Sequence, residues 1–407
     1  MFEINLAELV PKALRDAKAL LAGFPVNVFL GENPVSSTLI IPGYADKTRG
    51  RLSAMKYPED TRALRRAQTL YDAWLSFYRG EIEHAKETAV RLFEDIGDHE
   101  TKIPEKREVK ETPAYLQKLG AAYLICCLAR YGIPRFRTDA ATAYMRELKE
   151  SSLHCAQAAA IDLVMHEMSI GIMSDIPGWI KDGEFGVGRV GDKLLFSEDG
   201  VYPENIYAAV LAAVQYKNYH GEYMKSLALI DTAEKVYGMR SVIIGDFYFA
   251  LYRALNLDAL GFPDEADTCL RRAVQLVKKD ALWLVVAEFI GAFHGRLQSV
   301  IEEEAPEGAE RCADISSGFF DRIRRSHDDE KSRRGYKKLT DQEILVIQML
   351  SEGRRGTDVA NELCIEPRTV KYHKTHATEK LGIPTDASPR ELKTALEHYI
   401  TSAVWMP

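Results

Sequence analysis

Apolar residues recur at steps of three and four over residues 60–325, and this periodicity constrains the fold of the chain more than any other feature. Leu64, Ala67, Leu70 and Trp74 show it in one segment. Such spacing places apolar side chains on one face of an α-helix, whereas strand-like alternation is scarce. The pattern predicts helices over residues 61–78, 81–96, 114–131, 139–150, 155–173, 204–218, 221–237, 242–260, 263–279 and 281–300.

Three of the predicted helical hairpins share a turn pattern, in which a glycine is followed five residues later by a small residue. The pairs are Gly80 with Ala85, Gly221 with Ser226, and Gly261 with Ala266. Glycine lets the turn reach positive φ, and the small residue lets the second helix pack closely on the first. Stacked helix pairs at a period of roughly 34–45 residues are typical of an α-solenoid. The region resembles tetratricopeptide-type repeats, and an irregular helical bundle is the alternative.

The chain divides into four predicted parts. Residues 1–60 contain short apolar runs between Gly and Pro and are of uncertain type. Residues 61–325 are predicted to form a helical-repeat sensor or interaction domain. Residues 326–338 are charged and read as a solvated linker, and residues 339–403 form a separate domain.

Residues 174–203 interrupt the helical pattern and include the sequence GVGRVG at residues 186–191. A dinucleotide site with this GxGxxG pattern needs a strand before it and a helix after it. Here a polar stretch precedes the glycines and the apolar run KLLF follows them, so we interpret the segment as a loop or hairpin. We expect no cofactor, no catalytic residues and therefore no enzymatic activity.

The last part of the chain is punctuated by helix caps. Thr340 and Glu343 have the spacing of a capping box, and so do Ser388 and Glu391. The first box opens a helix that ends at Gly353. A short helix over residues 357–363, a tight turn, a third helix over residues 367–381 and a fourth helix to about residue 401 follow. Two short helices joined by a tight turn predict a helix-turn-helix.

The third of these helices carries the side chains that a DNA-reading helix needs. Long basic side chains reach phosphates or guanine edges, and Thr reaches phosphate or base. Arg354 and Arg355 precede the second helix, whose first amides could also bind phosphate. The candidate DNA-binding residues are Arg354, Arg355, Thr357, Arg368, Thr369, Lys371, Tyr372, Lys374, Thr375 and His376.

The segment from Leu339 to Ile383 resembles the LuxR-type helix-turn-helix, which has the patterns L-T-x-R-E, T-V-K-x-H and K-L-G-V at the spacing seen here. Residues that coincide with the family pattern are Leu339, Thr340, Glu343, Gly353, Ala360, Leu363, Ile365, Thr369, Val370, Lys371, His373, Lys380, Leu381 and Gly382. The resemblance implies that the positions of Lys371, Tyr372 and Thr375 face the groove, and that the fourth helix serves dimerisation on double-stranded DNA.

This sequence departs from the family pattern at several positions. Gln342 replaces the usual Arg, Leu345 a Glu, Gly356 an Asn, Glu366 a Ser and Ala377 a larger apolar residue. Glu366 is a poorer N-cap than Ser and adds negative charge near DNA. We expect these changes to alter affinity and specificity more than the fold.

A helical-repeat region before this domain is similar to the C-terminal part of MalT-like regulators. The P-loop sequence of their ATPase module is absent, and so is the alternating βα pattern of a receiver domain. The resemblance therefore implies a transcription regulator controlled by an unidentified small-molecule or protein effector, with RNA polymerase as a further partner. A tetratricopeptide-like scaffold with a vestigial DNA-binding domain is the alternative.

Charge is distributed unevenly along the chain. Residues 331–407 contain thirteen Lys and Arg against ten Asp and Glu, a net charge of +3, whereas the remainder has a net charge of −10. Such asymmetry is typical of a nucleic-acid-binding end. The six cysteines form no CxxC pair, and the chain has no long apolar segment. We expect free thiols, no metal site, no membrane association and a cytoplasmic location.

Overall fold

The structure, a computed structural model, is described here for most of the chain after residue 60. The described residues are 61–97, 100–101, 113–151, 155–170, 176–183, 187–190, 193–196, 206–236, 243–293, 295–317, 339–381 and 383–401. The predictions for residues 1–60 and for the linker at 326–338 fall outside them.

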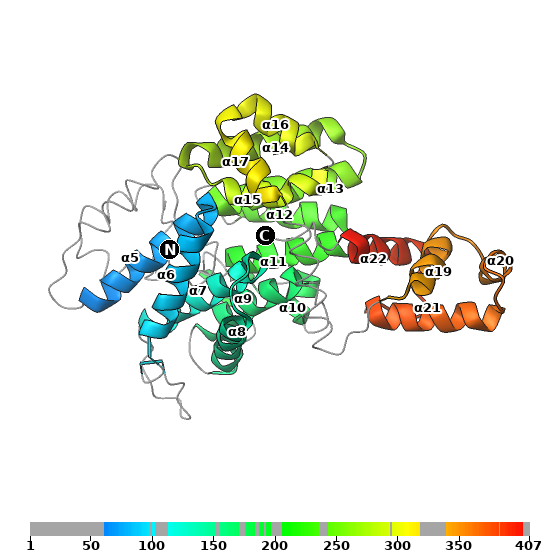
Figure 1. Cartoon of the computed structure of the whole chain (residues 1–407), viewed down its shortest axis with the longest axis horizontal. Helices are drawn as coiled ribbons and strands as arrows, with labels where there is room; N and C mark the ends of the chain where they lie inside the picture. Colours follow the sequence, from blue (N-terminus) through cyan, green and yellow to red (C-terminus); the bar gives the residue numbers. More distant parts are fainter. Residues whose placement is uncertain are drawn as a thin grey trace.

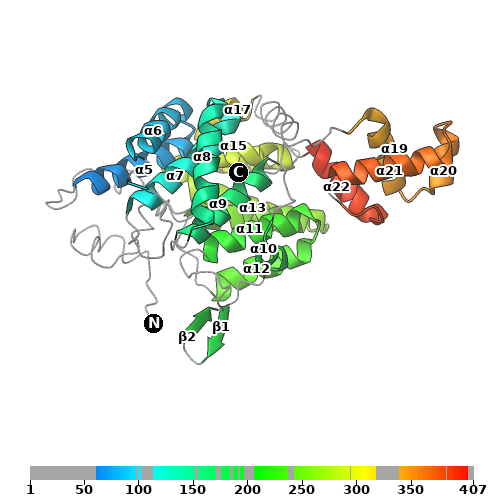
Figure 2. The same cartoon turned by 90° about the horizontal axis from the view of Figure 1, so that it is seen from below.

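The described chain is all-α apart from one short hairpin, as the periodicity predicted (Figures 1 and 2). Before residue 318 the helices are α5 (Thr61–Arg79), α6 (Ile82–Asp95), α7 (Pro113–Leu128), α8 (Arg135–Lys149), α9 (Ala156–Ser169), α10 (Gly178–Asp182), α11 (Ile206–Tyr219), α12 (Tyr223–Val236), α13 (Ile243–Ala259), α14 (Pro263–Val277), α15 (Trp283–Phe289), α16 (Arg296–Glu304) and α17 (Pro306–Ser316). Short 3-10 helices η1 (Ala129–Tyr131), η3 (Lys278–Asp280) and η4 (Ile290–Phe293) extend three of them.

The three glycine turns have one common geometry. Gly80, Gly221 and Gly261 have φ values of 79°, 70° and 86°. In each turn the glycine N–H donates to the carbonyl three residues back, and the next N–H donates to the carbonyl five residues back. This pattern closes the preceding helix with a left-handed residue. The small residue five positions on is fully buried in all three hairpins, so the repeat predicted from the sequence is present as a shared turn.

The first hairpin also packs against the last helices of the region, because α5 contacts α15. Arg79 Nε donates to the carbonyl of Asp280 at 3.0 Å, and Arg311 Nη2 donates to the carbonyl of Gly80 at 2.7 Å. A Cβ on Gly80 would lie 2.7 Å from Cδ1 of Ile315. The first hairpin and the last helices of the region are therefore in contact, so the stack is closed. One continuous apolar core extends through all the hairpins.

A buried ion pair joins η1, which follows α7, to α15. The carboxylate of Glu288, which is 1% exposed, lies 3.3 Å from Nε of Arg130 and accepts a hydrogen bond from the hydroxyl of Tyr131. Burial raises the pKa of Glu288, and Arg130 and Tyr131 oppose that rise. The two partners come from segments about 157 residues apart in the sequence.

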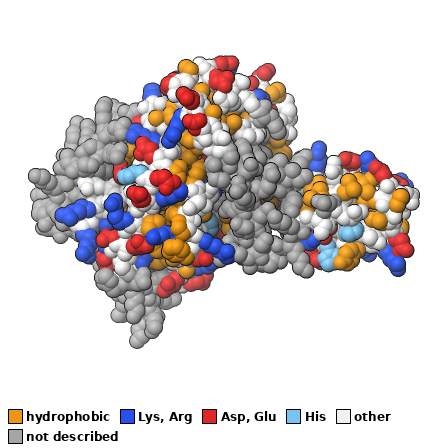
Figure 3. All heavy atoms as spheres, in the orientation of Figure 1, with side chains coloured by type: hydrophobic (Ala, Val, Ile, Leu, Met, Phe, Trp, Pro, Cys, Tyr) orange, Lys and Arg blue, Asp and Glu red, His pale blue; other side chains and the backbone are white. Residues whose placement is uncertain are grey.

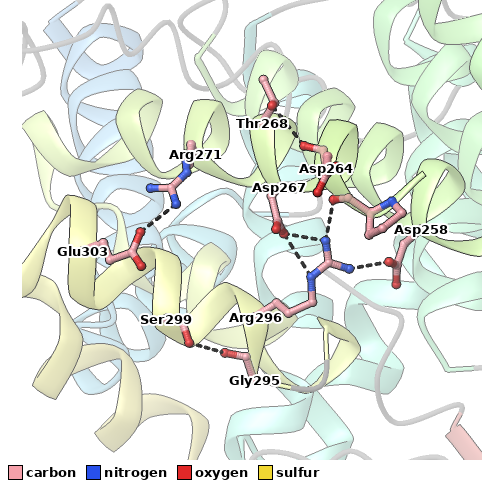
Figure 4. A network of polar contacts seen from close by, with 10 residues as sticks. Asp258, Asp264, Asp267, Thr268, Arg271, Gly295, Arg296, Ser299 and Glu303 are labelled. Atoms are coloured by element: carbon pink, nitrogen blue, oxygen red, sulfur yellow. Dashed lines mark hydrogen bonds and ion pairs between the residues drawn. The ribbon is translucent and has the colours of Figure 1, made fainter. Parts of the chain in front are cut away.

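A second polar network fastens α16 to the hairpin of α13 and α14 (Figure 4). Arg296 Nε donates to Asp267 at 3.0 Å, its Nη2 donates to the carbonyl of Pro263 at 2.7 Å, and its Nη1 pairs with Asp258. Arg271 on α14 reaches Glu303 on α16 at 2.7 Å. These contacts join two consecutive units of the stack.

The structure corrects one expectation about the helical region. The single helix predicted over residues 281–300 is wrong: α15, η4 and α16 occupy this segment, and Gly295 breaks it at a φ of 90°. All seven residues of α15 are buried, so the apolar pattern there has no polar face to mark its ends. Further along, α17 lies in a highly charged segment inside the predicted helical region.

The insertion at 174–203 contains α10 and the antiparallel strands β1 (Val187–Val190) and β2 (Lys193–Phe196). Gly188 pairs with Leu195 across the two strands. The described part of the GxGxxG pattern therefore lies in a β-hairpin, and a strand follows it where a dinucleotide site would need a helix.

Candidate nucleic-acid interface

Four helices form the C-terminal part: α19 (Asp341–Ser351), α20 (Gly356–Glu362), α21 (Pro367–Leu381) and α22 (Pro389–Thr401), shown in orange to red in Figure 1. Two apolar clusters hold them together. One joins α19 to α21 and α22 through Leu339, Ile347, Ala377, Ala387, Leu392 and Leu396. The other joins α19 to α20 and α21 through Val346, Met349, Val359, Ala360 and Val370.

The turn between α20 and α21 sets the angle between these two helices. Cys364 has a φ of 54°, a left-handed conformation that is uncommon outside glycine. The N–H of Ile365 donates to the carbonyl of Ala360 at 3.0 Å, which closes α20. Ile365 then packs beside the second cluster. This is the helix-turn-helix geometry that the sequence predicted.

Both predicted capping boxes are formed. The N–H of Glu343 donates to Oγ1 of Thr340 at 3.2 Å, and the Glu343 carboxylate accepts from the N–H of Thr340 at 2.7 Å. Ser388 and Glu391 make the same pair of bonds at 3.3 and 2.7 Å. In the exposed second box, the backbone and side-chain hydrogen bonds of Ser388 lower the pKa of Glu391.

The first capping box is also tied to the end of α21. Nζ of Lys380 donates to Oε1 of Glu343 at 2.8 Å and to Oε2 at 2.5 Å. Glu343 is only 4% exposed, and burial alone would raise its pKa. The hydrogen bonds from Lys380 and Thr340 outweigh that effect and lower it. One carboxylate therefore caps α19 and positions α21 against it.

The outer face of α21 presents a stripe of polar side chains. Arg368, Lys371, Tyr372 and Thr375 follow the spacing i, i+3, i+4 and i+7, which places them on one side of the helix. The first three are exposed and Thr375 is partly buried. The opposite side contributes Val370, Ala377 and Thr378 to the interior.

Flanking side chains widen this surface. The ring of Tyr372 lies 4.2 Å from that of His376, centroid to centroid. Thr369, Lys374 and His376 are partly buried, whereas Arg354, Arg355 and Thr357 are exposed where α20 begins. All ten candidate residues thus have at least part of their surface accessible, and seven of them lie on α21.

Acidic side chains are paired with three of the candidate basic residues, which the sequence reasoning did not foresee. Arg354 contacts both Glu352 and Glu362. The other two pairs are Arg368 with Glu366 and His376 with Glu379, the latter at 3.7 Å. On the face seen in Figure 3, basic and acidic side chains are interspersed over these helices. In most of these pairs the partners lie two or three residues apart in the sequence, and this short spacing could have predicted the pairing.

Other site chemistries find no support in the part of the chain that the structure describes. No cluster of His, Cys, Asp and Glu there could hold a metal ion. None of the described helices is long and apolar enough to cross a membrane. All six cysteines are free thiols.

Comparison with known proteins defines the class of this domain. Residues 337–388 match the family "Bacterial regulatory proteins, luxR family". The C-terminal part of the chain is therefore a LuxR-type helix-turn-helix domain.

Two relatives are each similar to a segment covering about a fifth of this chain. "Putative HTH-type transcriptional regulator Rv0890c" of Mycobacterium tuberculosis is 37% identical over 79 residues, which is 19% of this chain and 9% of that protein. "Putative HTH-type transcriptional regulator Mb0914c" of Mycobacterium bovis is 36% identical over 77 residues, or 19% and 8%. The chain thus matches less than a tenth of the length of these relatives. No solved structure matches it.

Proposed function

We propose that this protein is a transcription regulator that binds promoter DNA through α21. The observation that carries the proposal is the exposed stripe of Arg368, Lys371, Tyr372 and Thr375 on a helix whose other face is fixed in the core of a LuxR-type domain. In helix-turn-helix proteins the second helix lies in the major groove, with base edges read from its N-terminal part. The names of the relatives are consistent with this role.

The contacts divide by chemistry. Lys371, Tyr372 and Thr375 are proposed to face base edges. Arg355 and Lys374 flank the stripe and would neutralise phosphates, which fix the orientation of the domain but carry no sequence information. Because phosphate contacts release counterions, affinity should fall steeply with salt. If two paired domains neutralise roughly six phosphates, the logarithm of the binding constant falls with a slope of about −5 against the logarithm of salt concentration.

The helical region of residues 61–325 is proposed as the input. Stacked helical hairpins present broad surfaces for a partner or a ligand. Binding there would control the spacing or dimerisation of the DNA-binding domains of two chains, in the cytoplasm and beside RNA polymerase. The effector is unidentified, and so is the target promoter.

Genome-wide mapping of the DNA that the protein occupies would identify fragments for the decisive test. Fluorescence anisotropy of the full chain on such a fragment should show tight, salt-dependent binding. Lys371→Ala should weaken it by about 1–3 kcal/mol if Lys371 contacts a base edge. Lys225→Ala, which removes the same charge from α12, is the matched control and should leave affinity nearly unchanged.

Two results would count against the proposal. Equal affinity of the Lys371 variant and the wild type would refute the role of that residue. Failure to bind any genomic fragment, together with co-purification of a protein partner free of nucleic acid, would favour the helical scaffold with a vestigial DNA-binding domain.

A further inference from the structure

Arg368 is the most exposed of the ion-paired basic side chains in the C-terminal domain. It is the second residue of α21, and its side chain is 85% exposed. Its Nε contacts Oε2 of Glu366, the residue that precedes the helix and is itself 63% exposed. Among the described residues, Glu366 is the one ion-pair partner of the Arg368 guanidinium. The two terminal nitrogens of Arg368, Nη1 and Nη2, have no partner among these residues.

This arrangement differs from that of Arg354, the other paired arginine of the domain. Arg354 contacts Glu352 through Nε and Glu362 through Nη1. A terminal nitrogen of Arg354 is therefore occupied, and the side chain bridges the end of α19 and the end of α20. The Arg368 contact engages Nε of the guanidinium and leaves Nη1 and Nη2, at its outer edge, without a partner among the described residues on a side chain that is 85% exposed.

The free outer edge fits one base in particular. Guanine presents two acceptors, O6 and N7, in the major groove, and an arginine that donates two parallel hydrogen bonds to them makes the commonest specific contact in protein–DNA complexes. Arg368 lies at the N-terminal end of the helix proposed to enter the groove, on the same stripe as Lys371 and Tyr372. Its position therefore suits a base contact better than a contact to the flanking backbone.

The carboxylate of Glu366 adds two effects. It restrains a long, flexible side chain before DNA arrives, so less conformational freedom is lost on binding. Its negative charge also disfavours any placement of Arg368 against a phosphate, because the carboxylate would then lie near the phosphate as well. Both effects direct the guanidinium toward base edges.

We propose that Arg368 reads a guanine through Nη1 and Nη2, and that Glu366 is the positioning residue that holds it for this contact. The inference rests on the proposed function, since it names a specificity determinant of the same DNA-binding surface. It assigns a role to a glutamate at which this chain departs from its family pattern.

The test measures base preference at each position of the site. The full chain is bound to a set of duplexes made from its best genomic fragment, in which every base pair is replaced in turn. The wild type should prefer guanine at one position of the half-site by about tenfold or more. Arg368→Ala should abolish that preference at that position alone. Arg368→Lys should do the same, because an ammonium cannot make the two-pronged contact.

The Glu366 variants separate positioning from a merely structural role. Glu366→Gln and Glu366→Ser should reduce the guanine preference severalfold while binding to non-cognate DNA strengthens, because a negative charge near the phosphates is lost. Glu362→Gln, which alters the pair with Arg354 instead, is the matched control and should leave the preference unchanged. Circular dichroism should show the same helix content in all variants, since both side chains are exposed.

Each failure has its own signature. A wild type that binds none of the duplexes refutes the proposed function and this inference together. Tight binding in which Arg368→Ala weakens all duplexes equally identifies a phosphate contact and refutes the inference alone. Glu366 variants that keep the guanine preference refute the positioning role. A preference that depends on Glu366 but survives Arg368→Ala shows that the glutamate reads a base itself, which also overturns the proposal.

Discussion

Replacing Glu343 tests how α21 is held against α19. The carboxylate accepts from the N–H of Thr340 and from Nζ of Lys380 at the same time. Loss of a helix cap costs about 1 kcal/mol. Loss of a hydrogen bond between charged groups costs about 1.5–3 kcal/mol. The Lys380 side chain, only 14% exposed, would also be left without this carboxylate. Glu343→Ala should therefore destabilise the packing of α21 on α19 by about 3 kcal/mol.

Hydrogen exchange of the full chain measures this loss locally. A destabilisation of about 3 kcal/mol should speed exchange of the α19 and α21 amides by roughly a hundredfold, whereas helices α5 to α17 should not change. Glu391→Ala is the matched control, because it removes the same kind of capping box on α22 from an exposed carboxylate. It should cost about 1 kcal/mol. Equal effects of the two variants would refute the contribution assigned to Lys380.

The difference in stability between the wild type and Glu343→Ala should depend on pH, and the pKa of Glu343 sets the direction of that dependence. The pKa of Glu343 is lowered in the folded protein, so the folded state favours the charged carboxylate. The stabilisation is fully present above the ordinary carboxyl pKa and is lost as pH falls through the lowered value. The gap between wild type and Glu343→Ala should therefore shrink on acidification. A gap that widens at low pH would contradict the ion-pair explanation.

Two further predictions concern the helical region, and urea unfolding followed by tryptophan fluorescence checks both. Gly80→Ala should cost more than Gly261→Ala: both force a left-handed alanine, at about 1–2 kcal/mol, but only at Gly80 would the new methyl lie 2.7 Å from Ile315. Equal losses would show that Ile315 moves aside freely. Arg296→Met should cost about 1–2 kcal/mol, because Asp267 and the carbonyl of Pro263 lose their donor. An unchanged midpoint would mean that the network in Figure 4 adds nothing to stability.

The C-terminal domain was the most predictable part of the chain because local chemistry sets its helix ends. The capping boxes at Thr340 and Ser388 are formed as their spacing indicated, and α21 begins and ends at Pro367 and Leu381 as predicted. A cap depends on residues three positions apart, so it can be read directly from the sequence. Helical periodicity, which is equally local, placed Arg368, Lys371, Tyr372 and Thr375 on one face of α21.

Contacts between distant segments could not be read in this way. The closure of the helical region depends on bonds such as Arg311 to the carbonyl of Gly80, about 231 residues apart. Periodicity identifies a buried face but says nothing about which helix covers it. The break at Gly295 was missed for a related reason. Because α15 is buried on all sides, it has no polar face whose pattern would show where the helix ends. Glu366 was recognised as a departure, but its contact with Arg368 needed the structure.

The contact between the first hairpin and the last helices changes how the helical region would respond to a partner. In an open stack each hairpin touches only its neighbours, so the ends of the stack unfold independently. Here α5 lies against α15, and Arg130 of η1 pairs with the carboxylate of Glu288 in the same interior. Separating these elements would leave that carboxylate buried without its partner, which costs about 3–5 kcal/mol. The first and last hairpins are therefore coupled through the core, and an effector that moved one of them would have to act on both.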